Sequence, residues 1–446
     1  MDEISGFPFY ALEITKEGKV FDARQKAAIE AAVRQAGAGR LTDLFVVSHG
    51  WNNDKRDARK LYDDLFGSVS AILAQPRMAG GDRHFAIVGV FWPSKKFAEE
   101  DLIPAGGVAR TAAAAGGRKL PASSLKAKLS SLKGTFDRPD KKVLDQAAAL
   151  VDKLEDSTDA QKKFVDLIRS VIPQHPADTS EDASNRFLRT PGDELLRALS
   201  APVMPTAPPS AGGGRALSVG LEGQRGGAAG LGDLFNGIQA AAWRMLNYTT
   251  YYQMKERAGV VGACLNGVLK VVRQLRPDLR IHLIGHSFGA RVVTAAADGP
   301  ASVGPASLAL LQGAFSHNGF TGKFDGRTDG FFRKVISQNK INGPIFATHT
   351  MNDRAVGIAY PLASRISGDN KLALGDESDV FGGIGRNGAV RMKSGEFVKG
   401  KLLPSDGRYA FSRGKVHNLL ADEFISGHSD VTGPQVANAL LQVATS

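Results

Sequence analysis

The sequence predicts an α/β protein with a mostly parallel central sheet, helices on both faces of that sheet, and one large helical insertion. Three observations lead to this prediction. Short apolar runs recur along the chain, stretches with the apolar spacing of helices separate them, and this alternation stops for about 140 residues in the middle.

Five apolar runs are the expected strands of the core. Because they lack an alternation of apolar and polar residues, each strand is expected to be buried on both faces, as in a parallel sheet. A sixth run, KVHNLLA at 415–421, is the expected last strand. The five runs are LFVVSH at 44–49, FAIVGVFW at 85–92, IHLIG at 281–285, SLALLQGA at 307–314 and PIFATH at 344–349.

Four stretches with helical spacing accompany these runs. Residues 22–36 precede the first run, 54–74 follow it, 252–275 lead into IHLIG, and 433–444 come after the last strand. The pattern is clearest in the second stretch, where every fourth residue is apolar and one face of the helix is expected to be buried. Its apolar positions are Leu61, Leu65, Val69 and Leu73.

Residues 96–236 are the expected helical insertion, which leaves 1–95 and 237–446 as the α/β core. The segment SSLKAKLSSLK places Leu125, Leu129 and Leu132 on one helical face, and two further amphipathic segments follow. Residues 200–232 are rich in Pro, Gly and Ala and are expected to be flexible. The insertion is expected to act as a lid over a site, as an independent decoration, or as a partner contact.

Composition excludes several classes of protein. A hydrophobic content of 43% with 23% charged residues is normal for a globular chain and excludes wholesale disorder or a fibrous repeat. The single cysteine, Cys264, excludes an intrachain disulfide framework and multi-cysteine metal sites. No secretory signal and no run of about 18 uninterrupted apolar residues is present, so a cytoplasmic location is expected, with signal-less export left open.

A net charge of +11 raises the question of a nucleic-acid partner. The basic residues are densest in 385–417, where they are spaced among Gly, Ser and Val without a series of aromatic residues for stacking. Nucleic acid is therefore not the expected partner. A solvated basic loop is one interpretation, and attraction to an anionic substrate or peripheral contact with a membrane surface is the other.

The strongest chemical feature is the sequence Gly285-His286-Ser287-Phe288-Gly289, which follows an expected strand directly and opens an expected helix. Such a strand–turn–helix elbow needs glycines, because side chains at 285 and 289 would collide with neighbouring chain. The turn holds its serine in a strained conformation at the carboxyl end of the sheet. Ser287 is therefore the candidate nucleophile, and a structural serine in a Gly-rich turn is the alternative.

A serine nucleophile requires a base, and the base requires an orienting acid. His428, in the loop SGHSDVTG after the last strand, is the candidate base, and His417 is the alternative. Asp353, a few residues beyond the strand that ends near His349, is the candidate acid, and Asp325 is the alternative. The resulting chain order of Ser, Asp and His is the order of α/β-hydrolases.

Two backbone amides are candidates for stabilising an oxyanion. The first expected strand ends in His49-Gly50-Trp51, where the glycine allows the backbone to turn the Trp51 N–H toward the reaction centre. The Phe288 N–H, at the start of the helix after the elbow, is the second candidate donor. Trp51 as an ordinary core aromatic is the alternative.

These motifs together resemble the α/β-hydrolase superfamily, in its serine esterase and lipase branch. The sequences SHGWNND, FWPS and HSD are similar to those of bacterial α/β-hydrolase-like proteins. The resemblance covers roughly 1–95 and 237–446, and it implies a triad of Ser287, Asp353 and His428. It also implies oxyanion donors at Trp51 and Phe288, although the loop after Gly50 departs from the HGGG form, which leaves the acyl-chain size open.

The resemblance implies a serine hydrolase that cleaves carboxylic ester bonds through an acyl-enzyme, without a metal or organic cofactor. The expected substrate is a small-molecule ester or a lipid, so that esterase and lipase both remain open. Amide and thioester hydrolysis share the same triad. A catalytically inactive binding module and a phospholipid-directed effector are the alternatives from other classes, and no oligomeric state is predicted.

Overall fold

The computed structural model describes residues 2–35, 40–75, 83–94, 119–173, 184–201, 204–205, 235–353, 355–356, 366, 373–374 and 377–446. The chain divides into two compact units. One, here called the α/β unit, comprises Met1–Lys95, Arg257–Asp353 and Gly383–Ser446. The other, the helical unit, comprises Lys96–Glu256 and Arg354–Gly382. The boundary expected at residue 237 falls next to the start of helix α8 (Ile238–Leu275), which runs through both units.

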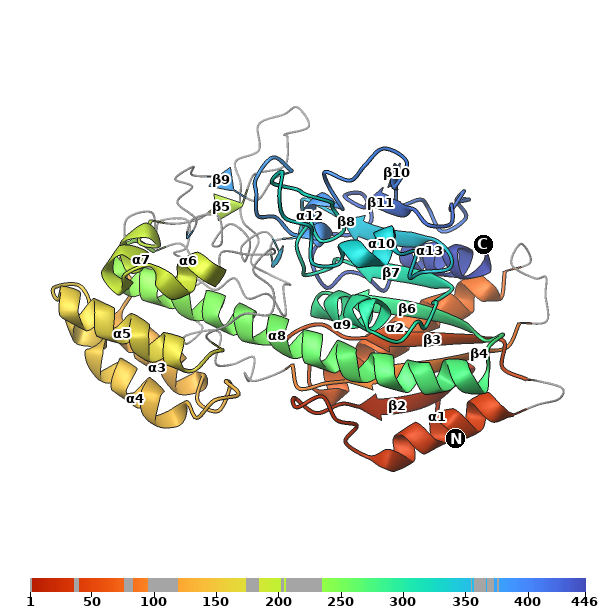
Figure 1. Ribbon diagram of the computed structural model, residues 1–446, viewed down its shortest axis with the longest axis horizontal. Coiled ribbons are helices and arrows are strands. Elements are labelled where there is room, and N and C mark those ends of the chain that lie inside the picture. Colours follow the sequence, from red (N-terminus) through yellow and green to blue (C-terminus); the bar gives the residue numbers. More distant parts are fainter. Residues whose placement is uncertain are drawn as a thin grey trace. The chain divides into compact units, whose positions relative to one another are not determined.

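The α/β unit contains a nine-stranded sheet that is parallel except for the antiparallel pair β1–β2 (Figure 1). This arrangement confirms the predicted α/β class with a mostly parallel sheet. In sheet order the strands are β1 (Asp2–Ile4), β2 (Phe7–Glu13), β4 (Phe85–Phe91), β3 (Asp43–Ser48), β6 (Arg280–His286), β7 (Ser307–Leu311), β8 (Ile345–His349), β11 (Val416–Leu420) and β10 (Phe397–Lys401).

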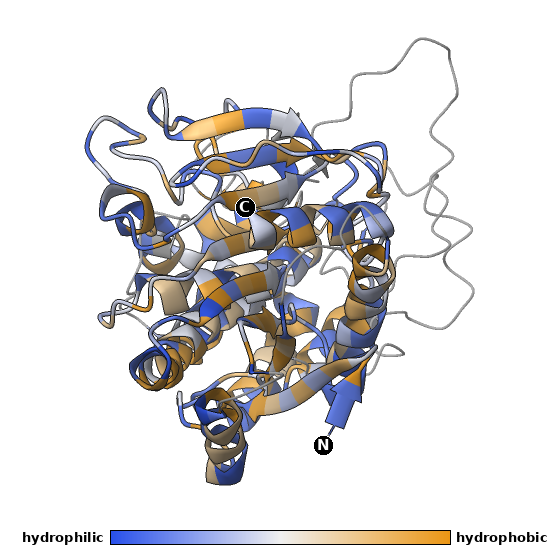
Figure 2. Cartoon of the chain, turned by 90° about the vertical axis from the view of Figure 1, so that its right-hand side faces the viewer, coloured by the Kyte–Doolittle hydropathy of each residue, from blue (hydrophilic) through white to orange (hydrophobic). Residues whose placement is uncertain are grey.

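The central strands are buried on both faces, as their continuous apolar runs predict. All residues of β3, β4 and β7 are buried, and apolar residues, orange in Figure 2, run through the strands. On one face, Phe45 and Val47 of β3 lie in a core cluster with helices α2 (Lys55–Leu73) and α13 (Pro434–Thr445). Leu44 and Val46 alternate to the opposite face and are equally buried.

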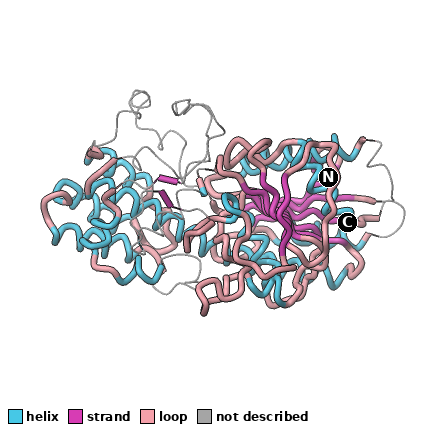
Figure 3. Tube along the Cα trace, turned by 90° about the horizontal axis from the view of Figure 1, so that it is seen from above, coloured by secondary structure: helices cyan, strands magenta, loops and turns pink. Residues whose placement is uncertain are grey.

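Local signals explain where the helices of this unit begin. Asp54 caps α2 in a reciprocal capping box with Asp57, and Asp22 caps α1 (Ala23–Arg34) by accepting a hydrogen bond from the Arg24 amide. Helix α9 (Phe288–Asp298) follows β6 and packs along β3, β6 and β7, and the strands lie between helices in Figure 3. The short helices are α10 (Arg333–Ser337) and α12 (Ile384–Asn387).

The helical unit has its own hydrophobic core, formed by the apolar faces that the sequence predicts together with the first half of α8. Leu125, Leu129, Leu132 and Tyr252 are fully buried in this core, and Trp243 is 8% exposed. Its elements are α3 (Ala122–Ser131), α4 (Lys141–Leu150), η4 (Val151–Lys153), α5 (Thr158–Ser170), α6 (Ser184–Arg189), α7 (Gly192–Ala198) and the strand pair β5 (Met204–Pro205) and β9 (Ala373–Leu374). Most of 200–232, the segment expected to be flexible, lies outside the described residues.

Helix α8 is long and apolar enough to cross a membrane, with a mean hydropathy of 1.2 over its best 18-residue window. Of that window, 44% is buried inside the protein. Core helices of soluble proteins pass the same test, so this property is weak support for a membrane span.

The register of the sheet brings the candidate site together at the carboxyl ends of the strands. Ser48 of β3 pairs with Gly285 of β6, which places the His49–Trp51 loop beside the turn that carries Ser287. His286 in turn pairs with Leu311 of β7. From β3 the chain continues to β4 on one side and from β6 to β7 on the other, so this is the point at which open α/β sheets form their sites.

Candidate functional site

Ser287 lies in the sharp turn between β6 and α9 that the sequence predicts. Its backbone has φ 57° and ψ −124°, which is a strained conformation for a residue with a side chain. The flanking glycines allow the turn: a Cβ on Gly285 would lie 2.4 Å from the Ala290 amide nitrogen, and one on Gly289 would lie 2.1 Å from the Ser48 carbonyl oxygen. Strand, turn and helix thus close tightly around Ser287.

The backbone of Ser287 is also held from the next strand. Its N–H donates to the Leu311 carbonyl, and its own carbonyl accepts from the Ala314 N–H, both at 3.0 Å. The last residue of β7 and the segment after it therefore fix the turn on both sides. A strained turn persists in a folded protein only when its surroundings determine it in this way.

In the structure, the side chains of the candidate residues Ser287, His428 and Asp353 are connected by hydrogen bonds. His428 Nε2 lies 2.8 Å from Ser287 Oγ, and His428 Nδ1 lies 2.8 Å from Asp353 Oδ2. An ionised carboxylate only accepts hydrogen bonds, so Nδ1 carries the proton and Nε2 accepts from the Ser287 hydroxyl. Asp353 is fully buried, whereas Ser287 is 4% and His428 9% exposed. The three residues form one hydrogen-bonded series from hydroxyl to carboxylate.

The alternative base and acid lie elsewhere. His417 sits in β11, where its Nε2 accepts a hydrogen bond from the Ser412 amide. Asp325 is an exposed turn residue whose carboxylate accepts from the Arg327 and Thr328 amides, and these bonds lower its pKa to about 2. Neither residue forms a hydrogen bond or ion pair with the Ser287 turn in the described part of the chain.

Comparisons of the whole chain with known proteins return nothing. No protein-family model, no curated protein and no solved structure matches it. The functional argument therefore depends on the geometry of the site.

The loop after β3 packs directly against Ser287. A Cβ placed on Gly50 would lie 2.5 Å from Ser287 Cβ and 3.0 Å from Ser287 Oγ, so only glycine allows this approach. The Trp51 ring meets the Phe288 ring edge-on at a centroid distance of 6.1 Å. Within the described part of the chain, the Trp51 N–H donates to no acceptor. It is thus free to bind an oxygen atom beside the serine.

His49 fixes the peptide group that carries this N–H. Its Nδ1 lies 2.9 Å from the Gly50 carbonyl oxygen, and its Nε2 accepts from the Trp92 amide at 3.2 Å. Both contacts require the neutral ring with its proton on Nδ1, and burial lowers the pKa of His49 to about 4, so this form persists. The C=O and N–H groups of a trans peptide point in opposite directions. Because His49 binds the Gly50 carbonyl oxygen, the Trp51 N–H of the same peptide group points away from His49.

Two further residues at the site escaped the sequence analysis. His286 Nε2–H donates to the main-chain carbonyl of His428 at 2.9 Å, and burial lowers the pKa of His286 to about 3, so the ring stays neutral. Gln312 Nε2 lies 3.2 Å from Asp353 Oδ2. His286 could have been found from its place in the elbow motif, whereas nothing in the sequence around Gln312 signals its contact.

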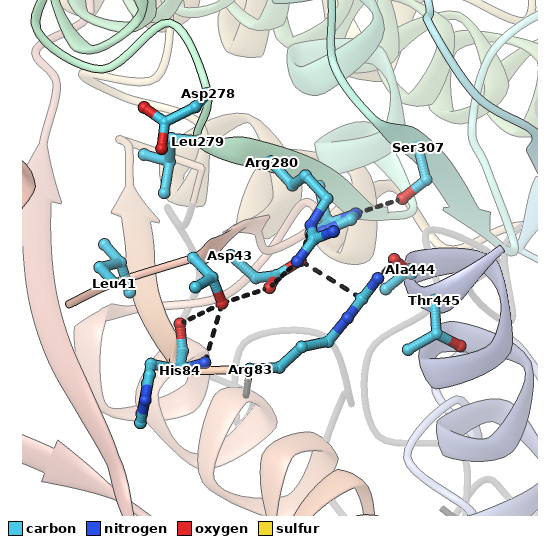
Figure 4. A network of polar contacts seen from close by, with 12 residues as sticks. Leu41, Asp43, Arg83, His84, Asp278, Leu279, Arg280, Ser307, Ala444 and Thr445 are labelled. Carbon is cyan, nitrogen blue, oxygen red and sulfur yellow. Dashed lines mark hydrogen bonds and ion pairs between the residues drawn. The ribbon is translucent and has the colours of Figure 1, made fainter. Parts of the chain in front are cut away.

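A second Ser–His–Asp arrangement lies at the opposite, amino-terminal ends of the strands (Figure 4). His282 Nδ1 lies 2.9 Å from Ser307 Oγ, and its Nε2 lies 3.0 Å from Asp43 Oδ1. Burial raises the pKa of Asp43, but hydrogen bonds from His282, Thr42 and Arg280 outweigh burial and lower that pKa to about 2. This network joins the amino-terminal ends of the central strands β3, β6 and β7, and Ser307 and His282 are at most 2% exposed.

The groups around Ser287 can support one kind of chemistry without further components. Ser287 supplies a hydroxyl, and the His428 imidazole accepts a hydrogen bond from it. Asp353 supplies a buried carboxylate, and the Trp51 amide points away from His49. Among the residues that the structure describes, no group of three or more His, Cys, Asp and Glu side chains could hold a metal ion.

Proposed function

We propose that the protein is a serine hydrolase of the α/β-hydrolase superfamily that cleaves carboxylic ester bonds. The observation that carries the proposal is the continuous series from Ser287 Oγ through His428 to Asp353, with both bonds at 2.8 Å. The strained backbone of Ser287 at the carboxyl end of the sheet supports it, because such strain clusters at functional sites.

The reaction begins when Ser287 Oγ attacks the ester carbonyl carbon while its proton passes to His428 Nε2. The C–O bond to the alcohol then breaks, and the alcohol leaves with the proton from Nε2. Water attacks the acyl-enzyme and gives a proton to Nε2, which returns it to Ser287 as the carboxylic acid departs. Asp353 keeps the Nδ1 proton in place throughout and stabilises the imidazolium.

The oxyanion of each tetrahedral intermediate accepts hydrogen bonds from the Trp51 and Phe288 amides. This assignment rests on the approach of Gly50 to Ser287 and on the peptide orientation that His49 imposes. A single donor of this kind contributes about 3 kcal/mol at the transition state. Because His49 holds the Trp51 peptide group in place before the substrate binds, this donor does not have to reorient during the reaction.

Lipid hydrolysis is a second candidate, which the surface charge favours. Lys399 and Lys401 of the edge strand β10 and the nearby Arg408 and Arg413 are exposed. Within the described residues none of these four takes part in an ion pair. Cations of this kind attract anionic headgroups, each worth about 1 kcal/mol near a charged membrane.

Hydrolysis of p-nitrophenyl esters of increasing chain length tests the proposed function. The Ser287→Ala variant is expected to lose activity, because it lacks the hydroxyl that attacks the ester in the proposed reaction. Ser307→Ala is the matched control, since it removes the hydroxyl of the other Ser–His–Asp arrangement. Activity that survives Ser287→Ala and disappears in Ser307→Ala would reverse the assignment.

The same esters distinguish the alternatives. A folded wild-type protein that hydrolyses none of them, with phospholipids included in the screen, would indicate an inactive binding module. Cosedimentation with vesicles of anionic phospholipid at low salt separates the esterase from the lipase. Binding that increases with anionic lipid supports the lipase, and its absence supports a soluble ester.

A further inference from the structure

Gln312 combines two features that are uncommon in a buried residue with a long side chain. It follows β7 directly and its backbone lies in the left-handed region, with φ 46°, although it has a long side chain. Its side chain is fully buried, and its Oε1 has no hydrogen-bond partner among the described residues. Both features cost stability, and residues keep such features chiefly at functional sites.

The contacts of the Gln312 amide nitrogen lead to the candidate site. Nε2 lies 3.2 Å from Asp353 Oδ2 and 2.8 Å from the Gly385 carbonyl oxygen. Both neighbours are acceptors, so the group that faces them is the NH2 and the amide orientation is fixed. Asp353 Oδ2 is also the oxygen that accepts from His428 Nδ1–H. One carboxylate oxygen thus receives both donors.

The backbone around Gln312 belongs to the same framework. The Gln312 N–H donates to Thr348 Oγ1 at 3.1 Å, and Thr348 lies in β8, the strand that leads to Asp353. The neighbouring residues Leu311 and Ala314 hold the backbone of Ser287. A single four-residue segment therefore fixes the nucleophile through its main chain and the acid through a side chain.

We infer that Gln312 is a positioning residue of the hydrolytic site: its amide holds the Asp353 carboxylate in the orientation in which Oδ2 accepts the His428 Nδ1 proton. The inference rests on the proposed function. The Gln312 amide adds a donor to the same oxygen that accepts from Nδ1–H, and this second direction restrains rotation of the carboxylate about its Cβ–Cγ bond.

Other charged and titratable groups near His428 have to be considered in any pH measurement. His286 contacts the His428 main chain and stays neutral, because burial lowers its pKa to about 3. The Arg386 guanidinium donates to the main-chain carbonyl of Asp353 at 3.2 Å and carries its charge throughout. Asp422 and Asp430 lie on the loop after β11. None of these groups changes in the variants below.

Two substitutions test the inference. Gln312→Leu keeps an apolar side chain of similar bulk, one atom shorter, and removes the donor, so kcat is expected to fall about 10- to 100-fold with KM nearly unchanged. Gln312→Glu keeps the shape and adds a carboxylate next to Asp353. Two buried carboxyl groups in contact do not both ionise readily, so the pair is expected to keep a shared proton to higher pH than a single carboxyl group would, and the acidic limb of the kcat/KM profile is expected to move to higher pH.

Gln442→Leu is the matched control, because the Gln442 amide on α13 also joins a main-chain carbonyl to a side-chain oxygen, away from Ser287. It is expected to lower the melting temperature while kcat and the pH profile stay unchanged. A merely structural role for Gln312 would give this same pattern in Gln312→Leu and an unmoved limb in Gln312→Glu, and that result would overturn the inference.

The proposed function and this inference can fail separately. Reaction of the wild-type protein with a fluorophosphonate reports on Ser287 alone. If the wild type is labelled at Ser287 and hydrolyses esters but both Gln312 variants keep its kcat and its pH profile, only the role of Gln312 is refuted. If the folded wild type is neither labelled nor active, the proposed function fails and the role of Gln312 fails with it.

Discussion

Substitution of Gly50 by alanine probes the oxyanion loop and leaves the side chains of Ser287, His428 and Asp353 chemically unchanged. The added Cβ would lie 2.5 Å from Ser287 Cβ, whereas carbon atoms in contact prefer about 3.5 Å. A gap of about 1 Å therefore has to open. Gly50 does not have a positive φ, so the collision, and not backbone strain, is the cause of any effect.

The displacement falls on the loop that carries Trp51. Ser287 cannot retreat easily, because Leu311 and Ala314 hold its backbone on both sides. A misplacement of about 1 Å reduces catalysis about 100-fold, and loss of one oxyanion donor reduces kcat about 100- to 1,000-fold, or about 3–4 kcal/mol. We expect Gly50→Ala to lower kcat for p-nitrophenyl acetate by about 100-fold.

The control for this experiment is Gly67→Ala in helix α2, where the added Cβ would have its nearest neighbour, Ser5 Oγ, at 3.6 Å. That variant is expected to keep its kcat and to gain about 0.5–1 kcal/mol in the free energy of unfolding, as alanine in place of a helical glycine does. Circular dichroism verifies that both proteins fold. A folded Gly50→Ala protein whose kcat stays within about threefold of wild type would refute the role of this loop.

Three further predictions concern the hydrogen-bonded series and the buried histidines. Asp353→Asn should lower kcat about 10,000-fold while the protein stays folded, because an amide favours the wrong tautomer of His428; a loss below about tenfold would contradict this role. His286→Leu should lower kcat about tenfold and His286→Gln should restore it, since glutamine can donate to the His428 carbonyl; equal effects of the two would argue against positioning by His286. In the folded protein burial lowers the pKa of His49 to about 4 and that of His286 to about 3. As the pH falls below 6.5, these two histidines therefore bind protons in the unfolded chain before they do so in the folded protein. The free energy of unfolding by urea should therefore be greatest above pH 6.5 and fall toward pH 4 by about 1.4 kcal/mol per unit for each histidine, and equal stability at pH 7 and pH 5 would contradict their burial as neutral rings.

The sequence predicts the centre of the sheet well, because those strands are buried on both faces and their apolar runs are continuous. It misses β2 (Phe7–Glu13), which includes Pro8 and alternates buried with half-buried residues, and the edge strand β10, where half-exposed or exposed residues replace the apolar run. The run at 307–314 is mostly apolar, but β7 ends at Leu311 because Gln312 adopts a left-handed conformation. Helix α8 begins well before the expected residue 252, because its first half is buried on most sides and shows little periodicity.

The sequence predicts those residues of the candidate site that follow the ends of predicted strands. Ser287, Asp353 and His428 follow predicted strands, and the register of a parallel sheet brings such positions to one edge. The sequence does not predict the roles of the residues that hold these groups in place, His49 and Gln312. The bonds of His49 to Gly50 and of Gln312 to Asp353 depend on side-chain directions and tautomers that only the packed structure determines.

The central claim is that Ser287 is an activated nucleophile. Intact-mass and peptide mass spectrometry after reaction with a fluorophosphonate tests it most directly. We expect one covalent adduct on the wild-type protein, located at Ser287, absent from Ser287→Ala and retained by Ser307→Ala. A folded wild-type protein that remains unlabelled, or an adduct on any residue other than Ser287, would contradict it.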